Sequence, residues 1–128
     1  MIFSGAYIII FFIPHSKRIQ IGKLGLLNFE QGYYCYVGSA LNKKLIARVR
    51  RHISPVSLKK IHWHIDYLFA ISDIRIIKSN VIPSSFREEC TIAQSIKKIS
   101  KDEVLRFGSS DCNCNSHLFY FGNNKPFK

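Results

Sequence analysis

The strongest constraint on the fold is an unbroken apolar run near the start of the chain, residues 6–13. Its side chains are mostly β-branched or aromatic, which is typical of a strand buried on both faces. The run is far shorter than the roughly 20 apolar residues that a helix needs to cross a bilayer. No cationic segment precedes it and Pro14 follows it, so it does not resemble a signal peptide. We therefore expect a buried strand in a cytoplasmic protein with no membrane association.

Turn residues and hydrophobic periodicity divide the rest of the chain into short elements. Alternation over residues 18–21 predicts a strand that pairs back on the first as a hairpin, and residues 33–37 predict a third strand. Asn42 is placed to cap a helix in which apolar residues recur at helical spacing as far as Ile53. Further along we expect a helix or turn over 62–70, a strand over 74–82, a helix over 86–100 and a strand over 118–121.

These elements predict one domain over residues 1–128, because no repeat, low-complexity stretch or flexible linker divides them. With 47% hydrophobic residues, the chain can bury about two-thirds of the surface that it exposes when unfolded. Interleaved strands and helices favour an α+β (α/β-like) fold, with a small, mainly antiparallel central sheet flanked by helices. The four cysteines are expected to be reduced thiols, because disulfides are rare in the cytoplasm.

The chain is strongly basic, with 19 Lys and Arg against 8 Asp and Glu, a net charge of +11. No acidic residue occurs from Gln31 to Ile65, a stretch that favours phosphate binding. Neutralising about five phosphates would give a slope of log affinity on log salt of about −4.5. The alternative is a solvated basic face. The candidate nucleic-acid-binding cations are Lys43, Lys44, Arg50, Arg51, Lys59 and Lys60.

Two tripeptides join tyrosine to glycine at the ends of predicted strands. Gly5-Ala6-Tyr7 opens the first strand and Tyr36-Val37-Gly38 ends the third. Glycine lets a backbone or a phosphate approach closely, so Gly38 is a further candidate for nucleic-acid binding. Core packing explains either tyrosine taken singly. Arg48 and His52 lie four residues apart and therefore share one helix face, close in sequence to the second tripeptide.

Together these residues resemble the signature of the GIY-YIG nuclease superfamily. The tripeptides read GAY and YVG, and YVGSALNKKLIARVRRH is similar to the family's strand, turn and helix. The segments KIHWHIDYL, FREECTIA and FGSSDCNCNSHLFYF are similar to a subfamily of short proteins, domain of unknown function 123, sometimes fused to endonuclease III-like repair enzymes. The resemblance covers nearly the whole chain.

The resemblance implies a metal-dependent endonuclease that hydrolyses DNA phosphodiester bonds, with RNA not excluded, and a link to DNA repair and a repair-protein partner. It implies that Tyr7 and Tyr36 are the paired tyrosines, Arg48 the phosphate-stabilising cation and Glu89 the ligand of Mg²⁺ or Mn²⁺. His52 is an auxiliary catalytic candidate, and Glu88 is a rival of Glu89. A tyrosine would take or relay the proton of the attacking water, or would only orient that water.

The alternative is a catalytically inactive nucleic-acid-binding module of the same fold. Two departures from the family pattern motivate it. An extra strand separates the two tripeptides, and the late asparagine of the family has no certain counterpart here.

A second metal site is conceivable at Cys112, Cys114 and His117, with Cys90, His62 or His64 as the fourth ligand. The Cys-x-Cys spacing is poor for a tetrahedral zinc site, which leaves an ordered loop as the other interpretation. His62, His64 and Asp66 either face a DNA channel or form a buried polar network.

Overall fold

A five-stranded antiparallel sheet forms the centre of the computed structural model, which describes residues 5–40, 45–53, 63–83, 89–108 and 116–126. The strand order is β5-β1-β4-β7-β6. The strands are β1 (Gly5–Ile13), β4 (Gly32–Ala40), β5 (Arg75–Pro83), β6 (Asp102–Glu103) and β7 (Leu118–Gly122). Each neighbouring pair is antiparallel, which confirms the expected α+β fold with its mainly antiparallel sheet.

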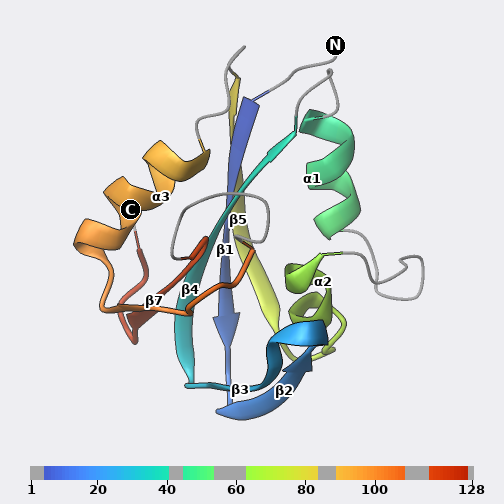
Figure 1. The fold of residues 1–128 in the computed structure, drawn as a ribbon, viewed down its shortest axis with the longest axis vertical. Coiled ribbons are helices and arrows are strands. Elements are labelled where there is room, and N and C mark those ends of the chain that lie inside the picture. Colours follow the sequence, from blue (N-terminus) through green and yellow to red (C-terminus); the bar gives the residue numbers. More distant parts are fainter. Residues whose placement is uncertain (1–4, 41–44, 54–62, 84–88, 109–115, 127–128) are drawn as a thin grey trace.

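Helices cover both faces of this sheet, as Figure 1 shows. On one face lie α1 (Leu45–Ile53) and α2 (His64–Phe69), and on the other lies α3 (Glu89–Ile99). Successive side chains of a strand point to opposite faces, so Tyr7 and Ile9 of β1 pack with α1 and α2, while Ile10 packs with α3. An apolar run such as residues 6–13 therefore suits the central strand, which has a hydrophobic core on each side.

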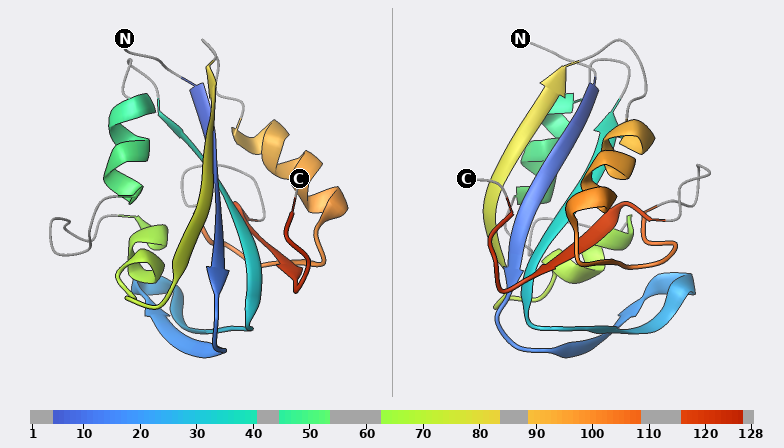
Figure 2. Two further views of the ribbon diagram at one scale, coloured as in Figure 1. Left: turned by 180° about the vertical axis from the view of Figure 1, so that it is seen from behind. Right: turned by 90° about the vertical axis from the view of Figure 1, so that its left-hand side faces the viewer.

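The sequence suggested that the second strand pairs with the first, but in the structure it does not. Instead β2 (Lys17–Ile21) pairs with β3 (Gly25–Phe29) in a separate two-stranded sheet, joined by the short helix η1 (Gly22–Leu24). Both edges of β1 are occupied by β4 and β5, which leaves β2 no edge on that strand. The hairpin buries Ile19, Ile21 and Phe29 in the core beside α2, at the lower end of the views in Figure 2.

The remaining predicted elements are present, with boundaries that the structure sets. The helix or turn predicted over 62–70 corresponds to α2, and the helix predicted over 86–100 corresponds to α3. The strands predicted over 74–82 and 118–121 correspond to β5 and β7. Asn42, the expected cap, lies outside the described residues. Within the described ranges, no helix is long and apolar enough to cross a membrane.

Candidate active site

The two signature tyrosines lie side by side on the sheet face that α1 covers. Tyr7 of β1 is directly opposite Gly38 of β4, and Tyr36 is opposite Ile9, two positions along. Residues two apart in a strand share a face, so both rings point the same way. Their centroids are 6.3 Å apart, and Tyr7 and Tyr36 are only 2% and 5% exposed. The pairing of GAY with YVG is thus a direct result of the β1–β4 register.

Gly38 lies beneath the ring of Tyr7. A Cβ atom at this position would stand 2.3 Å from Tyr7 Cζ and 2.4 Å from Tyr7 Oη, far inside van der Waals contact. The close approach that glycine permits here is to the tyrosine ring. Gly38 sets how deeply Tyr7 sits against β4.

His52, the auxiliary candidate, is fully buried at the C-terminal end of α1 and is hydrogen-bonded to Tyr7. Its Nε2 is 2.8 Å from Tyr7 Oη, and its ring lies 6.2 Å from that of Tyr36. When Nε2 accepts the tyrosine proton in this bond, the imidazole carries its own proton on Nδ1. The structure thus unites three predicted catalytic residues in one buried cluster, defined as the Tyr7–His52 site (Tyr7, Tyr36 and His52).

Asp66, for which the sequence left open a DNA channel or a buried polar network, completes this cluster. Asp66 of α2 is 2% exposed, and one of its oxygens lies 3.8 Å from His52 Nδ1. Arg51 donates two hydrogen bonds to the same carboxylate, at 2.9 and 3.0 Å. The Trp63 N–H donates a third, at 2.9 Å, which caps the start of α2.

Arg51 was predicted to bind nucleic acid, but the structure places its guanidinium in this ion pair. The bidentate contact with Asp66 leaves fewer of its donors for a phosphate. Arg50 is exposed on the outer side of α1. The other predicted cations, Lys43, Lys44, Lys59 and Lys60, lie outside the described residues.

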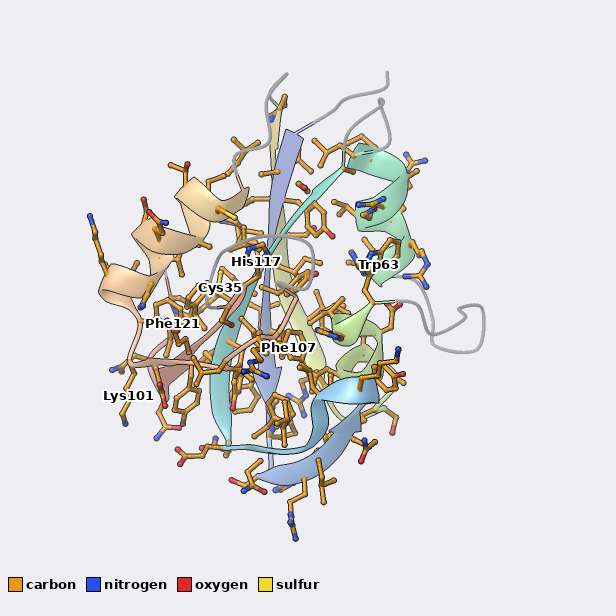
Figure 3. The ribbon with its side chains drawn as sticks, in the orientation of Figure 1. Cys35, Trp63, Lys101, Phe107, His117 and Phe121 are labelled. Atoms are coloured by element: carbon orange, nitrogen blue, oxygen red, sulfur yellow. The ribbon has the colours of Figure 1, made fainter. Side chains whose placement is uncertain are left out.

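Arg48 is held close to the cluster by Trp63. Its guanidinium carbon lies 4.7 Å from the centre of the indole ring, and Nη1 donates a hydrogen bond to the Ser39 carbonyl at 2.6 Å. Arg51 lies 4.5 Å from the same ring, and the ring of His52 is 5.5 Å away. The half-buried Trp63, labelled in Figure 3, thus orients both arginines and contacts the Tyr7–His52 site.

His64 connects α2 to the turn that covers Tyr36. Its Nδ1 accepts a hydrogen bond from the Gly108 N–H at 2.9 Å, and its ring packs on Phe107. Burial lowers the pKa of His64 below its ordinary value. Gly108 has φ +72°, and a Cβ there would stand 3.1 Å from Tyr36. Of the two interpretations of His64, the structure favours the polar network.

Glu89, the predicted metal ligand, is the first residue of α3. It therefore enters from the layer opposite α1, and its carboxylate lies outside what the structure describes, as does all of Glu88. Among the described residues, no group of three or more His, Cys, Asp or Glu side chains is arranged to hold a metal ion.

The cysteines depart from the expectation of four reduced thiols. Cys35 is a buried free thiol whose pKa is raised to about 12 by burial. Cys90, in contrast, is disulfide-bonded. Cys90 Sγ is also 3.7 Å from Nε2 of the buried His117. Of the zinc candidates, Cys112, Cys114 and His62 lie outside the described residues.

Fold and site together define a small α+β protein whose antiparallel sheet carries a buried tyrosine–histidine cluster beside stacked arginines. The sequence profile described as "Domain of unknown function DUF123" matches residues 6–128, and the chain belongs to this family. No curated protein and no solved structure gives a significant match.

Proposed function

We propose that this protein is a metal-dependent endonuclease of the GIY-YIG type that hydrolyses DNA phosphodiester bonds. The observation that carries the proposal is the 2.8 Å hydrogen bond between Tyr7 Oη and His52 Nε2, beside Tyr36. A tyrosine has an ordinary pKa of about 10 and is a poor base at neutral pH. A histidine nitrogen at hydrogen-bond distance supplies a destination for the tyrosine proton.

In the proposed chemical step, a proton moves along this hydrogen bond from Tyr7 to His52. The attacking water gives a proton to Tyr7 Oη while Tyr7 passes its own proton to His52 Nε2. The water oxygen bonds to phosphorus, and the bond from phosphorus to the leaving oxygen breaks. The imidazolium that forms faces the Asp66 carboxylate, 3.8 Å from Nδ1, which favours its positive charge. Arg48, oriented on Trp63, would stabilise negative charge on the phosphate oxygens.

Glu89 is the residue of this chain that would hold the metal. A single carboxylate at the start of α3 fits Mg²⁺ or Mn²⁺, because such ions keep several waters in their coordination shell. The bound ion would supply charge stabilisation for the leaving oxygen. The basic surface would supply affinity for the nucleic-acid backbone, whether DNA or RNA, and a repair protein would direct the domain to its target.

The second candidate function is a nucleic-acid-binding module without turnover. The specific observation in its favour is burial: Tyr7 and His52 are 2% and 0% exposed, as expected of a hydrogen bond that stabilises a core. In that case the basic charge remains functional and the tyrosine–histidine pair is structural.

Nicking of supercoiled plasmid with Mg²⁺ or Mn²⁺ tests the proposal. The wild type is compared with Glu89→Gln, Arg48→Ala and Tyr7→Phe, and we expect each variant to lose at least about 100-fold in rate. Asp102→Asn and Arg75→Ala are matched controls. Asp102 is exposed in β6, and Arg75 is opposite Phe12, at the far end of β1 from Tyr7.

The two candidate functions give different results in this experiment. Rates that fall in the three site variants and not in the two controls support the nuclease. Salt-sensitive DNA binding by a folded wild type that cleaves no substrate with either ion supports the binding module. Cleavage that persists in all three variants contradicts the proposed site.

A further inference from the structure

The strand β5 forms one edge of the central sheet. Its inner side pairs with β1, and in the described part of the chain no strand pairs with its outer side. In the right-hand view of Figure 2, β5 runs along the margin of the sheet. An edge strand presents backbone N–H and C=O groups that can hydrogen-bond to another strand, and short edge strands limit such pairing. At nine residues β5 is long, whereas β6 at the opposite edge has two.

Exposed apolar side chains gather along this edge. Among the described residues, six large apolar side chains are classed as exposed, and two of them, Ile77 and Val81 of β5, are 38% exposed. A third, Ile53 at the end of α1, is 47% exposed. Val81 is opposite Tyr7 of β1. Tyr7 in turn bonds to His52, the residue before Ile53, so α1 brings Ile53 to the level of Val81.

The orientation of α1 turns Ile53 towards β5. The helix contacts β4, β1 and β5, and on its β4 side Arg48 donates a hydrogen bond to the Ser39 carbonyl. At about 3.6 residues per turn, Ile46 and Ile53 project from the opposite flank of the helix. Apolar surface patches of this kind mark sites of interaction with other proteins. We define the edge surface as Ile46, Ile53, Ile77 and Val81.

Two features that protect edge strands from pairing both lie in the first half of β5. Ile77 has no partner in β1, because the register shifts there in a β-bulge, and the charged Lys78 follows. From residue 79 to residue 83 the register with β1 is regular, and no side chain is charged. The second half of β5 is therefore the part that suits a partner strand.

This half of β5 is compatible with pairing to its own copy. In an antiparallel pair about a two-fold axis, the residue on the axis is opposite itself. With the axis at Ser79 or Asn80, Lys78 of one copy is opposite Asn80 or Ile82 of the other. No two cations of β5 are then opposite each other, an arrangement that would destabilise the pair. The strand is thus self-complementary, as an interface between identical subunits must be.

We propose that β5 pairs with β5 of a second copy of this chain, antiparallel and about a two-fold axis at Ser79 or Asn80. The two sheets then join into one continuous sheet. An axis perpendicular to the sheet keeps both α1 helices on the same face, so Ile53 and Val81 of each copy lose contact with water beside the paired strands. This proposal does not rest on the nuclease.

The charge of the protein gives this dimer a distinctive salt dependence. Each copy carries a net charge of +11, and the repulsion between two copies opposes association. Salt screens that repulsion, since the Debye length falls from about 10 Å at 0.1 M to about 3 Å at 1 M. The dimer should therefore tighten as salt rises, whereas binding to a nucleic acid weakens.

Sedimentation velocity of the full chain, freed of nucleic acid, tests the proposal over about 1 μM to about 1 mM protein. We expect a monomer–dimer equilibrium that shifts towards dimer with added salt. Val81→Lys and Ile53→Lys should weaken it at least about tenfold, because each brings a charge to the buried edge. Leu26→Lys and Ile99→Lys add the same charge on β3 and at the end of α3. These two exposed positions are matched controls that keep wild-type association.

Cysteine substitution locates the two-fold axis. A residue on the axis is about 4.5–5.5 Å from its own copy between Cβ atoms, close enough for a disulfide to form after small shifts. We expect Ser79→Cys or Asn80→Cys to give a covalent dimer when dissolved oxygen oxidises the two thiols, read on a non-reducing gel. The wild type accounts for the native cysteines, and Asp102→Cys at the opposite edge of the sheet is the control.

Each result decides for or against the β5 interface. A wild type that stays monomeric at about 1 mM, at low and at high salt, overturns it and leaves the edge for a strand of a different protein. A dimer that the two control lysines weaken as much as the edge variants do contradicts it. So does a dimer in which neither Ser79→Cys nor Asn80→Cys cross-links above the wild type. The wild-type measurement decides even if a variant fails to fold, and none of these outcomes depends on DNA cleavage.

Discussion

The Tyr7 hydroxyl is a polar group inside a hydrophobic core, and its hydrogen bond to His52 offsets the loss of its hydration. Removing the hydroxyl leaves the buried His52 nitrogen without this partner. We expect Tyr7→Phe to lower the free energy of unfolding by about 1–3 kcal/mol, measured by urea denaturation. The half-buried Tyr33→Phe is the control, with an expected change within about 0.5 kcal/mol. Equal effects in both variants would contradict a special role for the Tyr7–His52 bond.

At Gly38, the addition of one methyl group tests the packing of the same tyrosine. In a strand, alanine normally stabilises relative to glycine by about 0.4–1 kcal/mol, because the unfolded chain has less freedom. Here the new Cβ would meet the Tyr7 ring at 2.3 Å. We expect Gly38→Ala to destabilise by about 1–3 kcal/mol, measured by urea denaturation. In a Tyr7→Leu background the cost should shrink, and a cost that stays the same would show that the ring is not the cause.

At the scale of elements, one carboxylate connects α1 to α2. Asp66 accepts two hydrogen bonds from Arg51 and caps α2 through Trp63. We expect Asp66→Ala to destabilise the protein by about 3 kcal/mol or more, because Arg51 then keeps a partly buried charge without its partner. Asp73, whose ion pair with Lys17 is on the surface, is the matched control. Asp73→Ala should lower the melting temperature far less than Asp66→Ala does. Similar losses in both variants would contradict the connecting role of Asp66.

The contact between α2 and the turn at Gly108 predicts a pH dependence. Burial lowers the pKa of His64 from its ordinary 6.5, so the unfolded chain takes up this proton at a higher pH than the folded protein does. The stability that neutral His64 contributes is therefore lost as pH falls from 6.5 towards the pKa of His64 in the folded protein. Protonation of Nδ1 also removes the acceptor of the Gly108 N–H.

The variant His64→Asn retains an acceptor near the Nδ1 position and does not titrate. We expect its urea midpoint to fall less than that of the wild type between about pH 7.5 and about pH 5.5. The difference between the two proteins separates the contribution of the half-buried His64 from those of the buried His52 and His117. Parallel losses in both proteins would show that His64 does not contribute.

Local patterns predicted most elements of this fold because hydrophobic periodicity acts within a few residues. The run over residues 6–13 predicted the central strand, and the spacing of Leu45, Val49 and Ile53 predicted α1. The prediction that β2 pairs with β1 was wrong, because strand pairing depends on which strand edges are already occupied. The contacts of Arg51 with Asp66 and of Cys90 with His117 span 15 and 27 residues, and only the packed sheet and helices bring them together.

At the scale of the whole molecule, the net charge is +11, but some of the cations are held in ion pairs within the fold. Arg51 is held by Asp66, and Lys97 is paired with Glu103. Cations held in such pairs release fewer counterions to a nucleic acid than exposed ones do. The number of phosphates that the protein neutralises is therefore smaller than its net charge, and salt dependence measures that number directly.

Salt dependence also separates the binding surface from the rest of the basic chain. With about five phosphates neutralised, log affinity for a DNA duplex should fall with log salt at a slope of about −4.5. Arg50 is exposed on α1, the helix that carries Arg48 and His52, and Arg50→Gln should reduce the slope by about 0.9. Arg75→Gln removes the same charge at the far end of β1 and should leave the slope unchanged. Fluorescence anisotropy over a salt series measures both slopes. Equal changes in the two variants would show that the charge acts as a diffuse field over the molecule, without a binding surface centred on α1.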